Sequence, residues 1–476
     1  MTTFRIHNFG CRATQADASA IEADLLASGA LLASNSVQAD IIVLNTCTVT
    51  EAADAQARDS IRHIHRTNSN ARILVTGCYA QRAPEEVAGL EGVSWVVGNS
   101  HQSQIPAVIR AAEATPISDM ECTPNPSGLV PLALVGTAME FHSAHRKIFV
   151  GDLSSASFDF SRPSALVSQD RTRPILKIQD GCDSHCSYCI IPSVRGASRS
   201  LAPDAVLKAI HDSVVFGVRE VVLSGINLGS YGRDLSPRVS LLNLLCRIVD
   251  ETPIESIRVS SIEPMDVTQD FVQLLASTPR FAPHFHMPLQ SGSDLTLRAM
   301  RRWYRAAHYE RRVELIREFI PNAAIGADVI AGFPGESEKN FQETIEFIDR
   351  LPFTYLHVFS FSSRPGTQAA ELPDQLAPFE IHRRASILRS LGESKESAFR
   401  ATQAGRLIRA LTLHKNKLGP KKPESTCEAE WTPALTGNFL KVRVEGTLPA
   451  NQWVEITMPT DDVPATLATS MEVQTA

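Results

Sequence analysis

Two stretches of this chain alternate short apolar segments with amphipathic ones, which is the pattern of parallel sheets covered by helices. The first stretch predicts four strands, at Phe4–Asn8, Asp40–Asn45, Arg72–Gly77 and Trp95–Val97. Helices are predicted between them, at Ala16–Ala27, Glu51–Arg66 and Glu85–Leu90. From Pro174 the alternation returns with six strands, at Ile175–Gln179, Glu220–Leu223, Ser256–Ser260, His284–Met287, Ala324–Ile330 and Tyr355–Phe359. Six successive βα units imply right-handed crossovers and a curved parallel sheet, either open or a partial barrel.

The length of 476 residues suits about three domains. We predict an N-terminal parallel α/β domain over residues 1–114 and a proline-containing linker over residues 115–170. The six βα units, together with a basic helical segment over about Pro378–Ala410, make a core domain over residues 171–404. Residues 405–462 change in composition, and Phe439–Val444 and Trp453–Met458 indicate a small C-terminal β-barrel. The fold class is therefore α/β with a β appendage.

The composition excludes several classes of protein. With 43% hydrophobic and 21% charged residues the chain is an ordinary globular protein, neither disordered nor fibrous. No stretch approaches the roughly 20 apolar residues of a membrane span, so no membrane partner is expected. The first residues carry no secretory signal, and we expect a cytoplasmic protein. Nine cysteines in a reducing compartment then favour metal binding or catalysis over disulfides.

Three cysteines cluster directly after the first strand of the second stretch. Cys182, Cys186 and Cys189 are separated by three and then two residues, with no fourth cysteine nearby. A structural zinc site or a ferredoxin-type cluster normally has four ligands, whereas three thiolates leave one iron of an iron–sulfur cube open. The competing interpretation is a zinc knuckle that borrows His185 or a distant residue.

A second trio emerges from the positions of the predicted strands. Cys11, Cys47 and Cys78 each follow a different predicted strand of the first stretch. In a parallel sheet all three lie at the same carboxyl edge, where open α/β sheets bind ligands. A buried cysteine is common as a small hydrophobic residue, but three such placements predict a second metal cluster. The remaining cysteines are interpreted as structural or incidental: Cys122, Cys246 and Cys427.

The three-cysteine motif, with Tyr188 before its last cysteine, resembles the radical S-adenosylmethionine superfamily. Two trios on consecutive domains narrow the resemblance to the methylthiotransferases. The matching stretches include Asn8-Phe9-Gly10-Cys11, Asn45-Thr46-Cys47-Thr48-Val49-Thr50-Glu51, Val75-Thr76-Gly77-Cys78-Tyr79-Ala80-Gln81, Pro288-Leu289-Gln290-Ser291-Gly292-Ser293 and Gly332-Phe333-Pro334-Gly335-Glu336. The similarity covers nearly the whole chain apart from the linker, and it implies that the C-terminal β-barrel is a TRAM domain of the kind that grips RNA in relatives.

This resemblance implies a radical SAM partial (βα)6 barrel, two 4Fe-4S clusters and S-adenosyl-L-methionine. It also implies a reaction that adds a methylthio group to carbon 2 of a modified adenosine at position 37, beside the anticodon of a tRNA. Cys182, Cys186 and Cys189 would ligate the cluster that cleaves S-adenosylmethionine to a 5′-deoxyadenosyl radical. Cys11, Cys47 and Cys78 would ligate the cluster that handles sulfur. The expected partners are a tRNA anticodon stem-loop, a reductant protein of unknown identity and an unknown sulfur donor.

Cofactor contacts are expected at the carboxyl ends of the core strands. Relatives carry a small-residue motif for the cofactor's amino group where this chain has Ser224 and Gly225, although a plain strand-to-helix turn would look the same. Ser261 and Glu263 follow the third strand and are candidates for ribose or methionine groups. The fifth strand runs from Asp328 to Gly332, and its backbone is expected to flank the adenine; Tyr188 completes the predicted cofactor residues.

RNA binding has to be reconciled with a formal net charge of −6. Between Arg406 and Glu445 eight Lys or Arg residues stand against four Glu, so the tail is locally basic. Arg298, Arg301, Arg302 and Arg305 form a second basic cluster. A single run of this kind is usually a solvated face, but two runs favour phosphate contacts.

The branch of the family is a separate question. The stretches around Cys47 and Cys78 look most like the branch that modifies N6-threonylcarbamoyladenosine, although Thr14 stands where asparagine is expected and Ala13 is smaller than usual. The alternatives are a methylthiotransferase acting on N6-isopentenyladenosine in tRNA and one acting on an aspartate of a ribosomal protein. An alternative of another class is a non-catalytic RNA-binding iron–sulfur protein.

Overall fold

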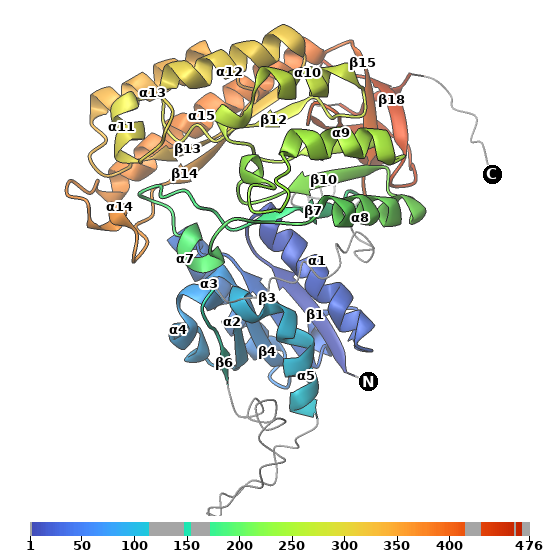
Figure 1. The fold of residues 1–476 in the computed structure, drawn as a ribbon, viewed down its shortest axis with the longest axis vertical. Helices are drawn as coiled ribbons and strands as arrows, with labels where there is room; N and C mark the ends of the chain where they lie inside the picture. Colours follow the sequence, from blue (N-terminus) through green and yellow to red (C-terminus); the bar gives the residue numbers. More distant parts are fainter. Residues whose placement is uncertain (1, 114–146, 154–171, 415–429, 461–462, 469–476) are drawn as a thin grey trace, which may run out of the picture. The chain divides into compact units, whose positions relative to one another are not determined.

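A computed structural model describes residues 2–113, 147–153, 172–414, 430–460 and 463–468 (Figure 1). The chain divides into two compact units, Met1–Arg162 with Ser193–Ala197 and Pro163–Pro192 with Ser198–Ala476. Most of the predicted linker, and with it Cys122, lies outside the described residues, as do Cys427, Lys415, Lys417, Lys421 and Lys422. None of the helices in the described ranges is long and apolar enough to cross a membrane.

Unit 1 is a six-stranded parallel sheet with the order β2-β1-β3-β4-β5-β6. Its strands are β1 (Thr3–Asn8), β2 (Leu31–Leu32), β3 (Ile41–Thr46), β4 (Arg72–Gly77), β5 (Val93–Gly98) and β6 (Ile148–Phe149). Its helices are α1 (Arg12–Ala27), α2 (Glu51–Thr67), α3 (Cys78–Arg82), α4 (Pro84–Ala88) and α5 (Ile105–Glu113). The four predicted strands are confirmed to within two residues at each end, and β6 brings part of the predicted linker into the sheet.

Alternation of side chains along the buried strands explains the two layers of helices in unit 1. Ile42 and Leu44 point to one face, where they pack with residues of α2, α3 and α4. Ile41 and Val43 point to the other face, where they pack with α1 and α5. Because successive side chains of a strand point to opposite faces, a sheet covered on both sides requires apolar residues throughout, and every residue of β3 is buried.

The core of unit 2 follows the six predicted βα units in chain order. Its strands are β7 (Ile175–Lys177), β10 (Glu220–Ser224), β11 (Ser256–Val259), β12 (His284–His286), β13 (Ala324–Ala331) and β14 (Tyr355–Ser360). They form two three-stranded parallel sheets, and bridges at Ile257–Phe281 and Ser261–His286 join β11 to the chain around β12. A short antiparallel pair, β8 (Gln179–Asp180) and β9 (Arg199–Ser200), flanks the cysteine motif. This arrangement confirms the partial barrel.

Helices connect these strands on the outside of the curved sheet. They are α8 (Pro203–Val215), α9 (Leu241–Glu251), α10 (Gln269–Ser277), α11 (Asp294–Ala299), α12 (Ala306–Phe319), α13 (Glu338–Arg350), α14 (Gln368–Glu371) and α15 (Pro378–Gln403). A further short helix, α7 (Ile191–Arg195), follows the cysteine motif, and its residues from Ser193 onward belong to unit 1. Several begin where the sequence carries a capping hydroxyl: the Ser337 side chain accepts a hydrogen bond from the Asn340 N–H at the start of α13. Strand β13 requires a glycine at position 326, because a Cβ there would lie 2.0 Å from the Tyr355 ring.

The predicted helix over Pro378–Ala410 is wrong at its C-terminal end. Helix α15 stops at Gln403, and after Gly405, which has a φ of +72°, the chain continues as a strand. A left-handed glycine ends a helix without a steric penalty. The segment Leu407–Thr412 then alternates exposed and buried side chains in its first half and is fully buried in its second, as a strand of a curled sheet does.

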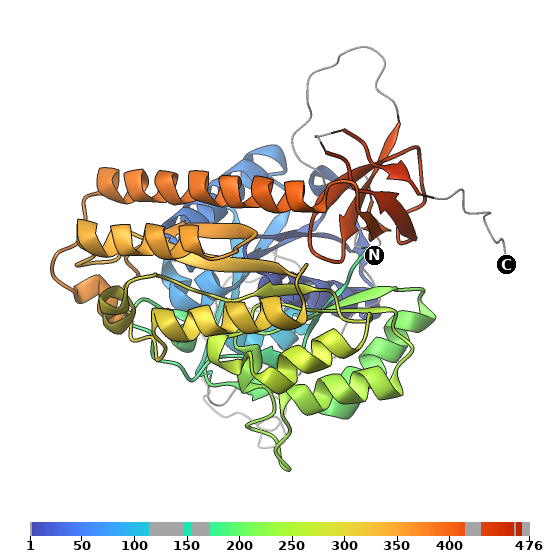
Figure 2. The same cartoon turned by 90° about the horizontal axis from the view of Figure 1, so that it is seen from above.

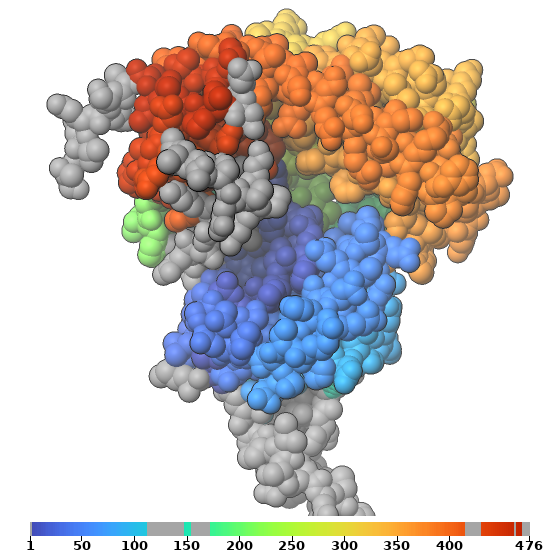
Figure 3. Space-filling view, turned by 180° about the vertical axis from the view of Figure 1, so that it is seen from behind, coloured from blue at the N-terminus to red at the C-terminus, as the bar shows by residue number. Residues whose placement is uncertain are grey.

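The C-terminal residues of unit 2 form an antiparallel sheet of five strands with the order β17-β16-β15-β18-β19. They are β15 (Leu407–Thr412), β16 (Trp431–Thr436), β17 (Lys441–Glu445), β18 (Trp453–Thr457) and β19 (Thr466–Leu467). The sheet curls so that Ala465 hydrogen-bonds with β17, which brings its two edges together. Figure 2 shows this sheet at the end of the long helix α15, and Figure 3 shows the two side by side on one face of unit 2.

A buried arginine, Arg258, joins the curled sheet to the core. Arg258 of β11 forms an ion pair with Glu220 at 3.0 Å and donates a hydrogen bond to the carbonyl of Gly437. Its guanidinium also lies over the ring of Phe439, whose centroid is 4.3 Å from that of His284. The core and the C-terminal sheet therefore form a continuous packed body.

Candidate active site

The first cysteine trio lies on the loop that follows β8. Gly181 supports the turn with a φ of +73°, and the Cys189 N–H donates to the Cys186 carbonyl. Burial, together with the neighbouring Cys186 and Cys182, raises the pKa of Cys189 to about 12. The three thiols are thus close enough to interact, and a bound metal would hold Cys189 as a thiolate at neutral pH.

Two side chains from distant parts of unit 2 reach the sulfur atoms of this trio. The Arg302 guanidinium lies 3.4 Å from Sγ of Cys186 and pairs with Glu263, and the Asn227 side-chain amide lies 3.8 Å from Sγ of Cys182. Arg302 was expected to contribute to a basic surface, but its side chain is only 4% exposed and it faces the cysteine loop. Spacing offers no signal for this contact, because Arg302 lies 116 residues from Cys186.

The second trio gathers at the carboxyl edge of the unit 1 sheet, as the strand positions predict. Thr46 pairs with Gly77 at the ends of β3 and β4, so Cys47 and Cys78 follow neighbouring strand ends. Cys11 follows β1 and is the N-cap of α1, which begins at Arg12 rather than at Ala16 as predicted.

Two glycines allow the three loops of this edge to approach one another. A Cβ on Gly10 would lie 2.5 Å from Cβ of Cys47, and a Cβ on Gly77 would lie 2.3 Å from the carbonyl oxygen of Thr46. Both glycines have positive φ angles. Burial raises the pKa of Cys47 to about 12, with Cys78 and Cys11 adding to the shift, so these thiols too converge.

The environment of the second trio parallels that of the first. The Asn99 side-chain amide donates to Sγ of Cys78 at 3.6 Å. Arg195 is almost fully buried in a 2.8 Å ion pair with Asp17 of α1, and its charge opposes the rise that burial causes in the pKa of Cys78. Thr14, the residue that departs from the family pattern, donates to the carbonyl of Cys11 at 2.8 Å. Sequence reasoning missed Asn99, Arg195 and Asp17, because none belongs to a motif.

The predicted cofactor residues divide into two groups. Glu263 and Gly225 lie beside the first trio. Glu263 pairs with Arg302, which contacts Cys186. A Cβ on Gly225 would lie 2.9 Å from Oε1 of Gln179, and the same oxygen accepts a hydrogen bond from the N–H of Asn227, which contacts Cys182. Ser224 is buried at the end of β10, and Tyr188 packs with Met300 and Phe333. The Gly332 N–H donates to Glu336, which is paired with Arg384.

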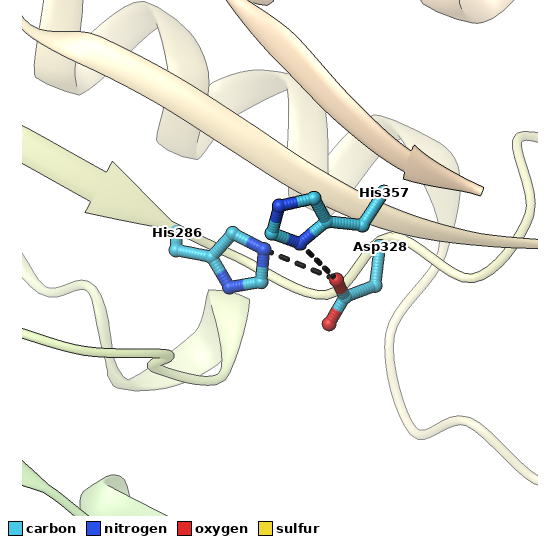
Figure 4. Close-up of side chains that lie close together, drawn as sticks. All are labelled: His286, Asp328 and His357. Carbon is cyan, nitrogen blue, oxygen red and sulfur yellow. Dashed lines mark hydrogen bonds and ion pairs between the residues drawn. The ribbon is translucent and has the colours of Figure 1, made fainter. Parts of the chain in front are cut away.

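Ser261 and Asp328 meet a residue that the sequence did not single out. Nδ1 of His286 lies 2.7 Å from Oγ of Ser261, and its Nε2 lies 3.1 Å from Oδ1 of Asp328. Asp328 also accepts a hydrogen bond from His357 at 3.2 Å (Figure 4). Burial alone would raise the pKa of Asp328, but the two histidines hold it well below its ordinary value.

Comparisons with known proteins agree with this geometry. Residues 3–98 match the model of "Uncharacterized protein family UPF0004", and residues 176–348 match the radical SAM superfamily. The threonylcarbamoyladenosine tRNA methylthiotransferase MtaB of Aquifex aeolicus (strain VF5) is 33% identical over 94% of this chain and 98% of its own length. This chain belongs to the radical S-adenosylmethionine methylthiotransferases.

Other relatives place this family membership in a wider setting. The tRNA-2-methylthio-N(6)-dimethylallyladenosine synthase of Acidothermus cellulolyticus is 33% identical over 86% of this chain and 77% of its own length. Among solved structures, the radical S-adenosylmethionine methyltransferase TsrM from Kitasatospora setae has a TM-score of 0.51, covering 78% of this chain and 77% of that one at 14% identity. The latter likeness shows the fold alone.

Membership in this family makes the chain an enzyme that works with 4Fe-4S clusters and S-adenosylmethionine. The residues present fit those groups. Each of the two trios offers three thiols, so each leaves one iron of a cube without a protein thiolate. Each trio also has a buried arginine and a side-chain amide directed at one of its sulfurs, which suits an anionic cluster.

Proposed function

We propose that this enzyme adds a methylthio group to carbon 2 of N6-threonylcarbamoyladenosine at position 37, beside the anticodon of a tRNA. The observation that carries the proposal is the pair of cysteine trios, one on the loop that follows β7 and β8 in unit 2 and one at the carboxyl edge of the parallel sheet of unit 1. A chain with one trio has a radical source but no second site for sulfur, whereas this chain has both.

The chemistry explains why two sites are useful. An aromatic C–H bond is not acidic enough for ordinary general-base chemistry at neutral pH. When bound, an iron–sulfur cluster and S-adenosylmethionine supply the one-electron chemistry that such a bond requires. The protein's contribution is to hold the thiolates, to tune them and to keep water away.

We assign Cys182, Cys186 and Cys189 to the cluster that activates S-adenosylmethionine. Arg302 places a positive charge against this trio, and its pairing with Glu263 fixes the direction in which the guanidinium points. We assign Cys11, Cys47 and Cys78 to the cluster that handles sulfur. Arg195, held by Asp17, has the corresponding role there.

The cofactor contacts follow from the same placement. We propose that S-adenosylmethionine binds above the first trio, in contact with Tyr188, Ser224, Gly225, Ser261, Glu263, Asp328 and Gly332. Support for this set is strongest for Gly225 and Glu263, since Gly225 packs on Gln179 and Glu263 is tied to the cysteine loop through Arg302. For Asp328 the proposed contact is through the backbone, because its carboxylate is already engaged by two histidines.

RNA binding is assigned to the C-terminal sheet. Arg409 lies over the ring of Trp453 at 4.3 Å, and both line a cavity of about 450 Å³ where this sheet meets the core. Stacked aromatic and guanidinium groups are suited to unpaired bases, and lysines and arginines to phosphates. We expect the affinity for tRNA to fall steeply with salt; a complex insensitive to salt would contradict this assignment. We propose a cytoplasmic location, which the tRNA substrate supports, with a reductant protein and a sulfur donor as further partners.

The lengths of the relatives favour the threonylcarbamoyladenosine branch. Identity does not separate the branches, because the MtaB and the dimethylallyladenosine relatives are both 33% identical to this chain. The match to MtaB extends over 98% of that protein, whereas the match to the dimethylallyladenosine enzyme covers 77% of that enzyme's length. The enzyme that acts on dimethylallyladenosine, which is the same nucleoside as isopentenyladenosine, is therefore the second candidate.

Nucleoside mass spectrometry of tRNA tests the proposal. In cells that lack the gene, the methylthio form of threonylcarbamoyladenosine should disappear and should return on complementation. Loss of the methylthio form of isopentenyladenosine instead would overturn the branch. Purified enzyme should release 5′-deoxyadenosine from S-adenosylmethionine under reducing, anaerobic conditions, which a non-catalytic iron–sulfur protein would not do.

A further inference from the structure

Three side chains inside the barrel of unit 2 converge on one point. They are His286 at the end of β12, Asp328 in β13 and His357 in β14 (Figure 4). Asp328 and His357 are paired directly across neighbouring strands, and His286 pairs with Gly326, two residues before Asp328. Their ligand atoms all lie within 4.8 Å of one another.

Two of the three separations between these atoms match those around a small metal ion. Nε2 of His286 and Nδ1 of His357 lie 3.1 Å and 3.2 Å from Oδ1 of Asp328. Two ligand atoms that each lie about 2.05 Å from a tetrahedral Zn²⁺ are about 3.3 Å apart. The site therefore needs little rearrangement to receive an ion.

Hydrogen bonding fixes one side of the His286 ring, whose Nδ1 lies 2.7 Å from Oγ of Ser261. Its Nε2 is buried and lies 3.1 Å from Oδ1 of Asp328, the same oxygen atom that His357 contacts. In a metal-binding histidine the nitrogen that does not bind the ion is held by a hydrogen bond, and Ser261 takes that position here.

We propose that His286, Asp328 and His357 bind one divalent transition-metal ion, separate from both cysteine trios. Two imidazoles and one carboxylate suit Zn²⁺ or Fe²⁺ better than Mg²⁺ or Ca²⁺, which prefer oxygen ligands. Three protein ligands leave a fourth position for water or for an oxygen atom of a substrate, as in catalytic zinc sites. That position is accessible, because the His357 side chain is 50% exposed.

Zinc binding to the full-length protein tests this site. Protein with both clusters reconstituted, so that the trio thiolates are occupied, is stripped of loose metal with a chelator and titrated with Zn²⁺. Zinc and iron per chain are then measured by elemental mass spectrometry. We expect one zinc per wild-type chain with no loss of iron.

Substitutions locate the zinc. His357→Gln, at a half-exposed position that should not affect folding, is expected to weaken zinc binding about 100-fold, and Ser261→Ala about 10-fold, since loss of an outer partner costs about 10–100-fold. Asp328→Asn should abolish zinc binding. If Asp328→Asn misfolds, the result for His357→Gln alone decides whether the zinc binds at this site. His382→Gln, on the exposed face of α15, and Cys246→Ser should both retain the zinc.

Three results would overturn the proposal. Wild-type protein could bind no zinc, His357→Gln could bind it as tightly as wild type, or each zinc gained could be matched by iron lost from a cluster. None of these measurements depends on tRNA or on turnover, so a failure here leaves the proposed methylthiotransferase reaction to its own test.

Discussion

The two cysteine trios of this enzyme are built in opposite ways. Cys182, Cys186 and Cys189 lie within eight residues of one another on a single loop, and all three are partly exposed. Cys11, Cys47 and Cys78 come from three strand ends, and two of them are buried. The first trio is a local motif, whereas the second exists only when the sheet of unit 1 has formed.

The surroundings of the trios are nevertheless alike. Each has a buried arginine paired with a carboxylate, Arg302 with Glu263 and Arg195 with Asp17. Each also has an asparagine amide directed at one sulfur, from Asn227 and from Asn99. An anionic cluster needs nearby positive charge and N–H donors wherever its ligands come from, so the same environment arises on two different scaffolds.

Removing each trio should give the largest effect and separate the two roles. Cys182→Ala, Cys186→Ala and Cys189→Ala together should halve the iron content and abolish release of 5′-deoxyadenosine. Cys11→Ala, Cys47→Ala and Cys78→Ala together should also halve the iron, yet leave 5′-deoxyadenosine release while methylthiolated product disappears. Iron analysis and product chromatography check this, with Cys246→Ser as a control; a variant that kept both clusters would sink the assignment.

Breaking the buried ion pairs should act on one cluster at a time. Arg195→Met removes the arginine from a fully buried ion pair with Asp17, at a cost of about 3–5 kcal/mol of unfolding free energy, and Arg302→Met removes the partner of Glu263, whose side chain is 19% exposed, at a smaller cost. Each loss of positive charge should also lower the midpoint potential of the adjacent cluster. Urea unfolding and redox titrations followed by electron paramagnetic resonance measure both quantities.

A double variant separates stability from potential. Arg195→Met with Asp17→Leu removes the whole pair, so it should recover stability but not the potential of the auxiliary cluster. If Arg195→Met instead shifted the potential of the cluster held by Cys182, Cys186 and Cys189, the parallel between the two environments would be broken.

The dependence of the second trio on close packing can be tested at glycines. Gly77→Ala should destabilise unit 1 by about 1–3 kcal/mol from backbone strain alone, and its Cβ would also collide with Thr46. Gly29→Ala is the matched control, because Gly29 also has a positive φ, of +92°, but has open space around it. Only Gly77→Ala should reduce loading of the auxiliary cluster, as judged by iron content; equal losses in both variants would point to strain rather than contact.

The asparagine amides should give the smallest effects. Oδ1 of Asn99 and Oδ1 of Asn227 have no hydrogen-bond partner among the described residues, so an alanine removes an unsatisfied oxygen along with the N–H donor. Stability should change by at most about 1 kcal/mol in Asn227→Ala and by about 1–3 kcal/mol in Asn99→Ala, because Asn99 also donates a 2.8 Å hydrogen bond to the buried carbonyl of Val194. The midpoint potential of the adjacent cluster should fall by less than in the arginine variants. If redox titrations show no change in potential in either asparagine variant, the two amides do not contribute to the likeness between the surroundings of the two trios.

Local patterns allowed much of the fold to be predicted. The main strands of the three parallel sheets were visible as short apolar runs, and the carboxyl-edge position of Cys11, Cys47 and Cys78 followed from them. The strand at Leu407–Thr412 was misassigned to the preceding helix, because the charged residues around it continue the helical composition and only Gly405 marks the break. The predicted boundaries between domains, and the choice of tRNA nucleoside, stay predictions.

The sequence alone predicted both trios. The first follows from the spacing of its cysteines within one motif, and the second follows because parallel strands end at one edge of a sheet. Only the tertiary structure decided what surrounds them. Arg302 reaches Cys186 across 116 residues, and His286, Asp328 and His357 meet from three strands. Such contacts leave no periodicity or spacing in the chain, because they depend on which side chains the strands and loops of the partial barrel bring next to one another.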